Sequence, residues 1–551
     1  MPYRIALLVD DLRVSKSVRD LAQWAKLHAG IELVALIAHP APQTTVKGFA
    51  KFRLLARTQG LYTAISRSAF AAMVMVESKL LLRNPVYREH LCLHDITDMA
   101  ATRLVTEPIV SPSGFVYRFS DIDLEKVRAL DLHALIRCGN GILKGEILTG
   151  ARDGVISMHH ADNRINRGGP AAFWEVLEGR AQTGFIIQRL TEELDGGDVL
   201  FRGSIATDLF YTRNQFNLAE RANTYVQLVI QRLSLGQLTP EPPHVYDRHM
   251  YRTPLLHNSL RYALLTLSRL TRKALRRAMG KKWHWGVAYS FQPWCSAVLW
   301  RSKILPAPKG SFIADPFVIE VDGSHYVFVE EYPYNTCKGV ISAYRIDRTG
   351  PQRIGVALEE PWHLSFPWVF RRDGNIYMVP EGGLDRSIRL YKAEHFPDHW
   401  SLCKVLMTDV TAADTMIFEH GERWWMFTTI CGEGGAANDA ELCVFYASEP
   451  EGEWTPHELN PVVMDANKGR NGGLLRDEEG SCYRIGQRHV FTRYGAGFSI
   501  YRIDELTPTT YAETLMQDVE PTFFEGIVGT HHFHADDGLA VIDFCRNERP
   551  R

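Results

Sequence analysis

Polar side chains able to carry out acid–base chemistry gather in two short segments of the first half of the chain. Residues 154–170 (GVISMHHADNRINRGGP) follow a short apolar run, and residues 192–198 (EELDGGD) come about 35 residues later. A histidine and an aspartate that converge could transfer protons, because the carboxylate orients the imidazole and stabilises its protonated form. His159 and Asp195 are the candidates for such a pair. On spacing alone, a structural or surface role for the histidines is the more common alternative.

An α/β sheet is the element expected to position these segments. Strand-like apolar runs alternate with helical patterns, which favours a parallel sheet with helices between its strands. Chemistry in such sheets collects at the carboxyl ends of the strands. No G-x-G-x-x-G follows the first strand, so a dinucleotide fingerprint is absent. The strand candidates are residues 4–10, 32–38, 132–137 and 155–159, and the helix candidates are 14–28, 170–177 and 214–235.

Residues 130–203 resemble the catalytic core of the formyltransferase family, which includes methionyl-tRNA formyltransferase and the sugar N-formyltransferases. The matching segments, in the order of the family pattern, are Gly139–Leu143, Ser157–His159, Arg167–Pro170, Gly179–Gly184 and Leu194–Asp198. The resemblance implies a Rossmann-like domain that uses 10-formyltetrahydrofolate as formyl donor and an amine as acceptor.

The resemblance also implies roles for single residues. His159 would assist the oxyanion or move a proton, and Asp195 would set the state of His159 and help remove the amine proton. Ser157 stands where the family has an asparagine whose amide donates to the oxyanion, and losing such a donor typically costs about 10²–10³ in rate. Ser157 acting through a bridging water, or the amide of Asn140 or Asn163, could replace it; otherwise the activity has been lost. Cofactor contacts are implied for Asn140, Gly141, Ile142, Leu143 and Asp198, and a substrate contact for Arg167.

The second half of the chain repeats one hairpin signal. A glycine in a tight turn lies between an apolar stretch and an aromatic-rich strand, at spacings of about 50 residues. Such turns need a positive φ, which glycine adopts readily. Five hairpins over about 250 residues predict a five-bladed β-propeller, with a β-sandwich as the alternative. The turn glycines are Gly323, Gly374, Gly421, Gly480 and Gly538.

These repeats are similar to the five-bladed propellers of glycoside hydrolase family 43 and of the N-terminal domain of glucosamine inositolphosphorylceramide transferases. The resemblance rests on segments such as Phe312–Phe317, Leu364–Pro367 and Ala413–Thr415. It implies inward carboxylates at Asp315, Asp414 and Glu381, which either hydrolyse a glycosidic bond or bind sugar hydroxyls. We favour recognition over hydrolysis. Further candidates are Arg470, His531 and His534, as pocket groups or as surface residues.

Residues 241–300 lie between the α/β pattern of the first half of the chain and the repeated hairpins of the second half. Arg261 to Lys282 carries eight basic residues and no acid, and Ala263, Leu267, Leu270, Ala274 and Ala278 share one helical face. A basic amphipathic helix can lie on an anionic membrane surface. The favoured alternative is a helix between domains whose apolar face packs on a neighbour.

Composition narrows the classes further. With 62 basic and 64 acidic residues, the formal charge is −2, whereas a nucleic-acid binder is usually far more basic. No apolar run is long enough to span a membrane, and the first residues do not have the pattern of a signal peptide. Nine scattered cysteines predict reduced core thiols rather than disulfides or a zinc site. We therefore expect a cytoplasmic protein, possible peripheral membrane contact aside, with neither a metal nor a nucleic-acid partner.

The sequence thus predicts a multidomain chain: an α/β Rossmann-like formyltransferase domain (1–240), a linker with a basic amphipathic helix (241–300) and an all-β five-bladed propeller (301–551). The predicted function is formyl transfer from 10-formyltetrahydrofolate to an amine on an amino sugar or glycan precursor held partly by the propeller. The alternative is a glycan-binding or glycosidase-like protein with a degenerate formyltransferase domain. A third hypothesis is a deformylase, with water as acceptor. A tRNA acceptor is not expected.

Overall fold

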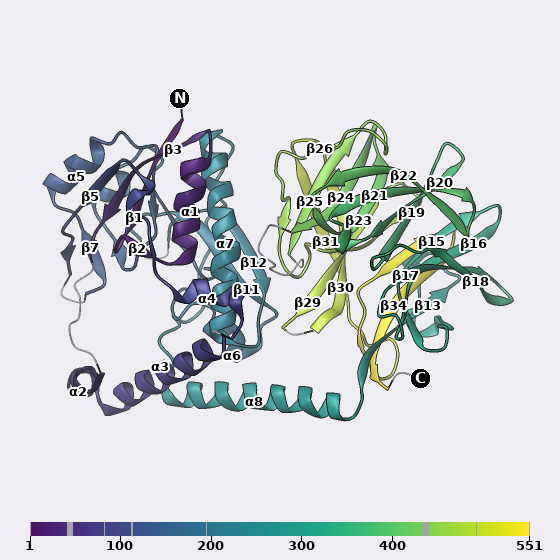
Figure 1. The fold of residues 1–551 in the computed structure, drawn as a ribbon, viewed down its shortest axis with the longest axis horizontal. Helices are drawn as coiled ribbons and strands as arrows, with labels where there is room; N and C mark the ends of the chain where they lie inside the picture. The colour runs from purple at the N-terminus through teal and green to yellow at the C-terminus, as the bar shows by residue number, and fades with distance from the viewer. Residues whose placement is uncertain are drawn as a thin grey trace. The chain divides into compact units, whose positions relative to one another are not determined.

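The computed structural model describes residues 2–40, 48–81, 83–111, 114–193, 196–431, 440–491 and 493–549. The chain forms two compact units, residues 1–268 and 269–551 (Figure 1). The boundary between the units lies inside the segment 241–300 that was predicted to be the linker.

A seven-stranded sheet forms the centre of the first unit, with the strand order β12-β11-β10-β8-β1-β3-β5. Strand β1 pairs in parallel with both β3 and β8, β10 pairs in parallel with β8, and the β11–β12 hairpin adds two antiparallel strands at one edge. The predicted α/β fold is confirmed. The bounds are β1 Tyr3–Val9, β3 Ile31–Ala38, β5 Thr102–Val105, β8 Ala134–Arg137, β10 Val155–His159, β11 Gln182–Arg189 and β12 Asp198–Ala206.

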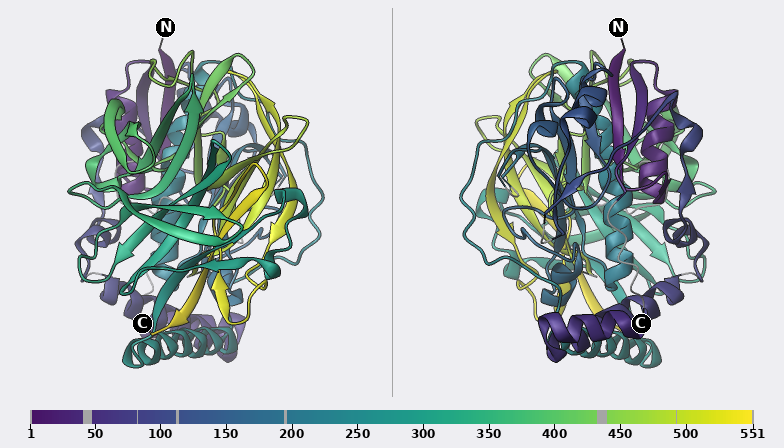
Figure 2. Two further views of the ribbon diagram at one scale, coloured as in Figure 1. Left: turned by 90° about the vertical axis from the view of Figure 1, so that its right-hand side faces the viewer. Right: turned by 90° about the vertical axis from the view of Figure 1, so that its left-hand side faces the viewer.

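Helices cover this sheet because its central strands are apolar on both faces. In β1, Ile5 to Val9 are completely buried, as expected for a strand with helices above and below it. Helix α1 (Lys16–Leu27) packs on α7 (Tyr211–Ser234) and presents Leu21, Ala22 and Ala25 to the core. The right panel of Figure 2 shows α1, in purple, beside the sheet. Shorter elements are β2 Arg13–Val14, α4 Pro85–Arg88, β4 His94–Asp95, β6 Ile109–Val110, β7 Val116–Arg118, α5 Asp121–Arg128, β9 Ile142–Leu143 and α6 Phe173–Glu178.

Three further helices are α2 (Gly48–Gln59), α3 (Leu61–Leu81) and α8 (Leu256–Ala278). A buried carboxylate joins α3, α7 and α8: Glu77 on α3 accepts hydrogen bonds from the N–H and hydroxyl of Thr212 at 3.0 and 2.9 Å, and from the hydroxyl of Tyr262 on α8. None of the helices in the described part of the chain has the length and apolar character needed to cross a bilayer.

The helix predicted near 261–282 is α8, but its apolar face is not packed on a neighbour as we favoured. Leu267 and Leu270 are exposed. The residues of α8 that are buried are Ser259, Tyr262 and Thr266, which lie beside this apolar row on the helix.

The second unit is a propeller of five sheets within the described residues, as predicted (Figure 1; Figure 2, left). Blade 1 is β15–β18, blade 2 is β19–β22, blade 3 is β23–β26 with β27, blade 4 is β28–β31, and blade 5 contains β13, β14 and β32–β34. The bounds of blades 1 and 2 are β15 Ser311–Val321, β16 Ser324–Pro333, β17 Val340–Asp347, β18 Gly350–Leu358, β19 Ser365–Arg372, β20 Asn375–Glu381, β21 Ser387–His395 and β22 His399–Thr408.

The propeller closes by pairing its first strand with its last. β13 (Lys282–Ser290) runs antiparallel to β34 (Leu539–Glu548) over its whole length. The propeller therefore begins near residue 282, and the predicted boundary at 301 is too late, because blade 5 takes strands from both ends of the unit. The other bounds are β23 Thr411–His420, β24 Arg423–Cys431, β25 Glu441–Ala447, β26 Thr455–Pro456, β27 Val463–Met464, β28 Asn471–Arg476, β29 Cys482–Val490, β30 Arg493–Leu506, β31 Tyr511–Val519, β32 Ile527–Gly529, β33 Phe533–Asp536 and β14 Lys303–Leu305.

The five predicted turn glycines all lie in hairpin turns with a positive φ, between +64° and +85°. Asp322, Asp373 and Asp537, which precede three of them, also have a positive φ, as two-residue turns of type I′ require. The expectation of core thiols is wrong for Cys92, Cys295, Cys337 and Cys403, which are exposed.

Replacing Glu77 by alanine would leave the donors of Thr212 and Tyr262 without an acceptor. A buried polar group left unpaired costs about 1–3 kcal/mol, so we expect Glu77→Ala to lower the unfolding free energy of the first unit by at least about 2 kcal/mol. Calorimetric unfolding of the full chain measures this loss. The matched control is Glu89→Ala, which removes a half-exposed ion pair with Arg19 and should cost less than about 1 kcal/mol. Equal losses in the two variants would contradict the assignment.

Candidate functional site

The first unit has a cavity of about 640 Å³ beyond the carboxyl ends of β1, β8 and β10. The sheet order places β3 on one side of β1 and β8 on the other, so the chain reverses its direction of strand addition between β1 and β8. Open α/β sheets bind ligands at such a topological switch point. Asp10, Arg137, Asn140, Ser157 and His160 are among the residues that line the cavity.

Asn140 is tied to the end of the first strand. The carboxylate of Asp10 accepts hydrogen bonds from the backbone N–H of Asn140 at 2.9–3.0 Å and from its side-chain amide at 2.7 Å. The cavity therefore contains an asparagine amide, as one of the predicted replacements for the missing family asparagine requires. Asn163 is buried and accepts a bond from Arg202 at 3.1 Å, and it is not among the residues of the cavity wall.

A buried arginine forms part of the cavity wall. The Nη1 of Arg137 contacts the Nε2 of His39, which is itself 3.7 Å from the Oδ1 of Asp10. Burial, followed by the charge of Arg137, lowers the pKa of His39 to about 4, so this imidazole is neutral and accepts from the guanidinium. The Nη2 of Arg137 is buried and has no hydrogen-bond partner among the described residues. A buried donor of this kind costs free energy unless a ligand or water pairs with it.

Two adjacent histidines lie at the end of β10: His159 is its last residue, and His160, which follows it, reaches the cavity. Ser157 and His160 line it, whereas His159 is half-buried and is not part of its wall. Burial, with a smaller contribution from His159, lowers the pKa of His160 to about 4. His160 is therefore a neutral imidazole at pH 7, able to donate one N–H.

None of the other predicted residues that the structure describes in this unit lines the cavity. Asp195 and Leu194 lie outside the described residues. Gly141 has a φ of +84° and packs against the ring of Tyr117, and Ile142 and Leu143 form β9, which pairs with β7. Asp198 begins β12 and lies 3.8 Å from Arg189.

Arg167 makes packing contacts. Its guanidinium stacks on Tyr246 at 4.5 Å and donates to the backbone oxygen of Asn163 at 3.1 Å, which fixes the segment after α7 against the first unit. The contact of Arg167 with a substrate stays a prediction.

A second hollow, of about 900 Å³, lies between residues 145–154 and 189–192. It lies at the amino ends of β8 and β10, at the opposite edge of the sheet from the first cavity, and none of the described residues that the sequence analysis assigned to the cofactor lines it. Its volume is in the range of pockets that hold cofactors of drug size. Leu132, Leu148 and Leu190 give it apolar walls, and Glu192 accepts from the backbone N–H of Gly145 at 2.6 Å.

Sequence reasoning missed the group formed by Asp10, His39 and Arg137. Two signals were present: Arg137 ends the apolar run ALIR, and Asp10 and His39 directly follow β1 and β3. Polar residues at the carboxyl ends of neighbouring strands meet at one sheet edge.

In the propeller, one backbone irregularity recurs in the inner strands of blades 1 to 3. Asp315, Phe366 and Asp414 have φ values of +49°, +46° and +52°, and the strand pairing shifts register at each of them. A β-bulge of this kind re-aims a side chain. The bulges bring Asp315 and Asp414 into one buried polar cluster at the propeller centre.

Asp414 is the most heavily bonded of these carboxylates. It forms an ion pair with Arg470 and accepts from the amide of Gln487 at 2.9 Å, while its backbone N–H donates to Glu381 at 3.0 Å. Arg470 also lies 3.6 Å from Glu381 and stacks under Tyr494. Both acids raise the pKa of Arg470 although burial opposes this, so the guanidinium stays charged. The structure thus brings Asp414, Glu381 and Arg470 together in one buried cluster, and their role in binding a substrate stays a prediction.

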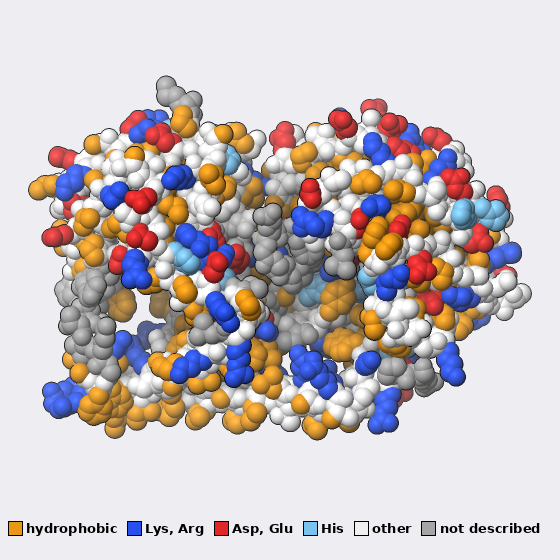
Figure 3. Space-filling model, in the orientation of Figure 1, with side chains coloured by type: hydrophobic (Ala, Val, Ile, Leu, Met, Phe, Trp, Pro, Cys, Tyr) orange, Lys and Arg blue, Asp and Glu red, His pale blue; other side chains and the backbone are white. Residues whose placement is uncertain are grey.

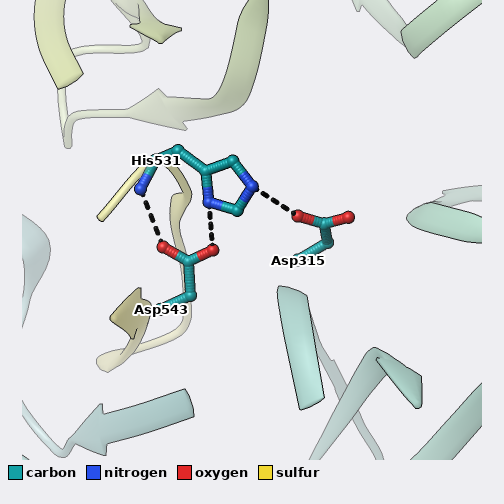
Figure 4. Close-up of side chains that lie close together, drawn as sticks. All are labelled: Asp315, His531 and Asp543. Carbon is teal, nitrogen blue, oxygen red and sulfur yellow. Dashed lines mark hydrogen bonds and ion pairs between the residues drawn. The ribbon is translucent and has the colours of Figure 1, made fainter. Parts of the chain in front are cut away.

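His531 lies between two carboxylates (Figure 4). Its Nδ1 contacts Asp543, whose other oxygen accepts the backbone N–H of His531 at 2.8 Å, and its Nε2 is 3.3 Å from Asp315. Burial lowers the pKa of His531, but Asp543 and Asp315 outweigh it and raise the pKa above the ordinary value. Burial raises the pKa of Asp315 to about 6.

Among the described residues, Asp315, His531 and Asp543 form a group that could hold a metal ion, because one ligand atom from each lies within 4.8 Å of the others. The carboxylates already flank the imidazole as ion-pair partners, so the arrangement is satisfied as a buried acid–histidine–acid triad. His534, another predicted pocket residue, is part of the core: its ring packs on Phe317 and Trp368, and burial lowers its pKa to about 3.

Comparisons with known proteins match the two units separately. Residues 278–524 match the family model described as glucosamine inositolphosphorylceramide transferase 1, N-terminal. Glucosamine inositolphosphorylceramide transferase 1 of Oryza sativa subsp. japonica is 38% identical over 207 residues, which are 37% of this chain and 28% of that protein. Methionyl-tRNA formyltransferase of Bacillus subtilis (strain 168) is 24% identical over 206 residues, 36% of this chain and 63% of that protein.

Among solved structures, the GH43B protein of the Bacteroides ovatus xyloglucan PUL aligns with a TM-score of 0.33 at 14% identity, over 43% of this chain and 52% of that chain. The predicted resemblance is confirmed: the chain joins a formyltransferase-like region to a propeller similar to the N-terminal part of the plant transferases. It spans about 28% of the length of those plant relatives. Its relatives are enzymes.

Asp543→Asn tests the triad through the pH dependence of stability. A histidine whose pKa is raised by folding contributes stability that is complete below pH ~6.5 and is lost as the pH rises through the raised pKa. We expect the calorimetric transition of the wild-type propeller to fall as the pH rises from about 6 to 9, and the Asp543→Asn variant to lose most of this slope. The variant should also lose about 3–5 kcal/mol, as for a broken buried ion pair.

The control is Asp518→Asn, which removes a half-exposed carboxylate 3.5 Å from Arg488. It should retain the wild-type slope and cost less than about 1 kcal/mol. A wild-type slope in Asp543→Asn would show that Asp543 does not set the protonation of His531.

Proposed function

We propose that the first unit transfers a formyl group from 10-formyltetrahydrofolate to a primary amine on an anionic amino sugar or glycan precursor. The observation that carries this proposal is the cavity at the switch point. Its lining includes three polar residues, Ser157, His160 and Asn140. The sequence similarity to methionyl-tRNA formyltransferase supports the reaction class.

The folate donor would fit the cavity at the carboxyl ends of β8 and β10, where Leu21, Ile136 and Ile156 give apolar walls and the volume of about 640 Å³ suits a pterin. Bound there, it would supply a formyl group to the amine. The residues of the chain would then stabilise the charge that develops on the formyl oxygen and carry the amine proton away. Ser157 and neutral His160 would donate hydrogen bonds to the oxygen, replacing the family asparagine. His159 and Asp195 keep the proton-transfer role that the resemblance implies.

The free guanidinium donor of Arg137 supports an acceptor with a negative group. A phosphate or carboxylate would pair with the buried Nη2 and remove its desolvation cost. Neutral acceptors would leave that donor unpaired, so they should bind more weakly.

The direct experiment incubates the full chain with 10-formyltetrahydrofolate and a panel of amines, and follows tetrahydrofolate release together with the mass gain of a formyl group. The panel pairs each amino sugar with its phosphorylated form, and Arg137→Gln should remove the preference for the phosphorylated one. Formate release without an amine product would indicate a deformylase instead. Failure to bind or turn over the folate would overturn the proposal.

His160→Ala separates the two adjacent histidines. Because His160 lines the cavity, we expect its loss to lower kcat by about 10²–10³-fold with little change in the KM for the amine. Single-turnover kinetics with the formyl donor measure this effect. A normal rate in His160→Ala together with an inactive His159→Ala would assign the whole role to His159, as the sequence pattern implied.

A second function, glycan recognition by the propeller, is supported by the central cluster of Asp315, Asp414, Glu381 and Arg470. Arg470 pairs with both Asp414 and Glu381 and holds these acids in a fixed network that can bind sugar hydroxyls, while burial raises the pKa of Asp414 to about 7. Tyr494, which stacks on Arg470 and is partly exposed, offers an aromatic face for a sugar.

Tyr494→Ala is therefore expected to reduce glycan binding by at least about tenfold without unfolding the propeller, because it removes an exposed ring. Glycan-array binding followed by calorimetry measures the loss. Trp300→Ala, which removes another exposed aromatic side chain, is the control and should bind normally. Equal binding by all three proteins, or release of free sugar by the wild type, would contradict a recognition role at this centre.

A further inference from the structure

An acid-free surface rich in exposed apolar side chains covers the helices α2, α3 and the first half of α8 in the first unit. On α8, Leu260, Leu264 and Leu267 recur at intervals of four and three residues, so they share one face of the helix. Leu264 is 68% exposed and Leu267 61%. Figure 3 shows orange and blue side chains next to each other along these helices.

Helix α3 adds a second apolar row. Leu61, Ile65, Met75 and Val76 are exposed and lie within one sector of the helix. Large apolar side chains that gather on a surface, rather than occurring singly, mark an interaction site. We call the exposed faces of α2, α3 and α8 the basic platform.

Hydrogen bonds hold two helices of the platform, α3 and α8, together. Glu77 binds Tyr262 and Thr212, the hydroxyl of Ser66 accepts the backbone N–H of Leu256 at 3.0 Å, and the hydroxyl of Tyr62 lies 3.3 Å from His257. These contacts fix the buried sides of α3 and α8 against each other. The exposed apolar rows are therefore presented by a preformed scaffold.

The charge of the platform has one sign. Residues 256–278, which form α8, contain six lysines and arginines and no aspartate or glutamate. Residues 33–76 also lack acids, and Glu77 is buried at the helix junction. Exposed basic residues on the platform helices are Lys51, Arg53, Arg57, Arg67, Lys79, Arg261, Arg272, Lys273 and Arg277. Such a bias is unusual in a chain whose formal charge is only −2.

We propose that the basic platform binds the surface of an anionic membrane. The leucines and Met75 would enter the boundary between headgroups and acyl chains, while the surrounding arginines and lysines bind anionic headgroups. A water-soluble acidic partner would explain the charges but not the apolar rows. A second copy of the chain would explain the apolar rows but would bring like charges together. An anionic bilayer complements both features.

The experiment is vesicle co-sedimentation of the full chain, with phosphatidylcholine alone or with about 30% phosphatidylglycerol added. The expected result is binding to the anionic vesicles only, weakened by salt because counterions screen the basic residues. Leu264→Glu/Leu267→Glu should lower the bound fraction at least about tenfold. Arg272→Gln/Lys273→Gln/Arg277→Gln should weaken binding and reduce its dependence on salt.

The matched control is Leu235→Glu, at a residue as exposed as Leu264. Leu235 follows the last residue of α7, a helix of 24 residues whose first residue, Tyr211, binds Tyr262, so it lies roughly 36 Å from that junction. This variant should bind like the wild type, and circular dichroism should be the same for all variants.

Several outcomes would overturn the proposal. They are the absence of wild-type binding to either vesicle, binding that survives Leu264→Glu/Leu267→Glu, and equal loss in Leu235→Glu. Analytical ultracentrifugation that finds a wild-type dimer dissociated by Leu264→Glu/Leu267→Glu would assign the face to self-association instead. None of these measurements depends on formyl transfer.

Discussion

A charge removed from water must meet a partner, and this constraint organises both units of the protein. In the first unit, Glu77 accepts hydrogen bonds from groups on α7 and α8 and thereby fixes three helices together. In the propeller, Asp543 binds two backbone N–H groups and the imidazole of His531. Separating these elements would leave buried polar atoms unpaired. The hydrogen bonds and ion pairs of these two carboxylates therefore also stabilise the fold.

The propeller builds its polar centre with a repeated local device. Left-handed residues at bulges in β15 and β23 bring Asp315 and Asp414 into the central cluster, and in β19 the corresponding residue is Phe366. Each acid also bonds to the next blade: Asp315 accepts the backbone N–H of Phe366 at 3.2 Å, and the backbone oxygen of Asp414 accepts from Asn471 at 3.0 Å. The residues at the bulges therefore also bond neighbouring blades to each other at the propeller centre.

The first unit has a buried polar group of a different kind. Its cavity contains a buried guanidinium donor that no described residue accepts, next to a neutral histidine and a serine hydroxyl. A buried donor without a partner lowers the stability of a core. In a binding site the ligand can supply the missing partner. Helices α2 and α3 and the first half of α8 belong to the same unit as this cavity.

The sequence by itself determined the order and type of the elements, because hydrophobic periodicity and turn chemistry are local: strand β10 and the five glycine turns lie where the pattern predicted them. It also gave the inward acids of the propeller through resemblance. Only the tertiary structure decided that Asp10, His39 and Arg137 meet, and that His160 reaches the cavity, because strand order joins residues distant in the chain. A helical pattern likewise groups residues on one face of α8, but whether another element covers that face depends on packing.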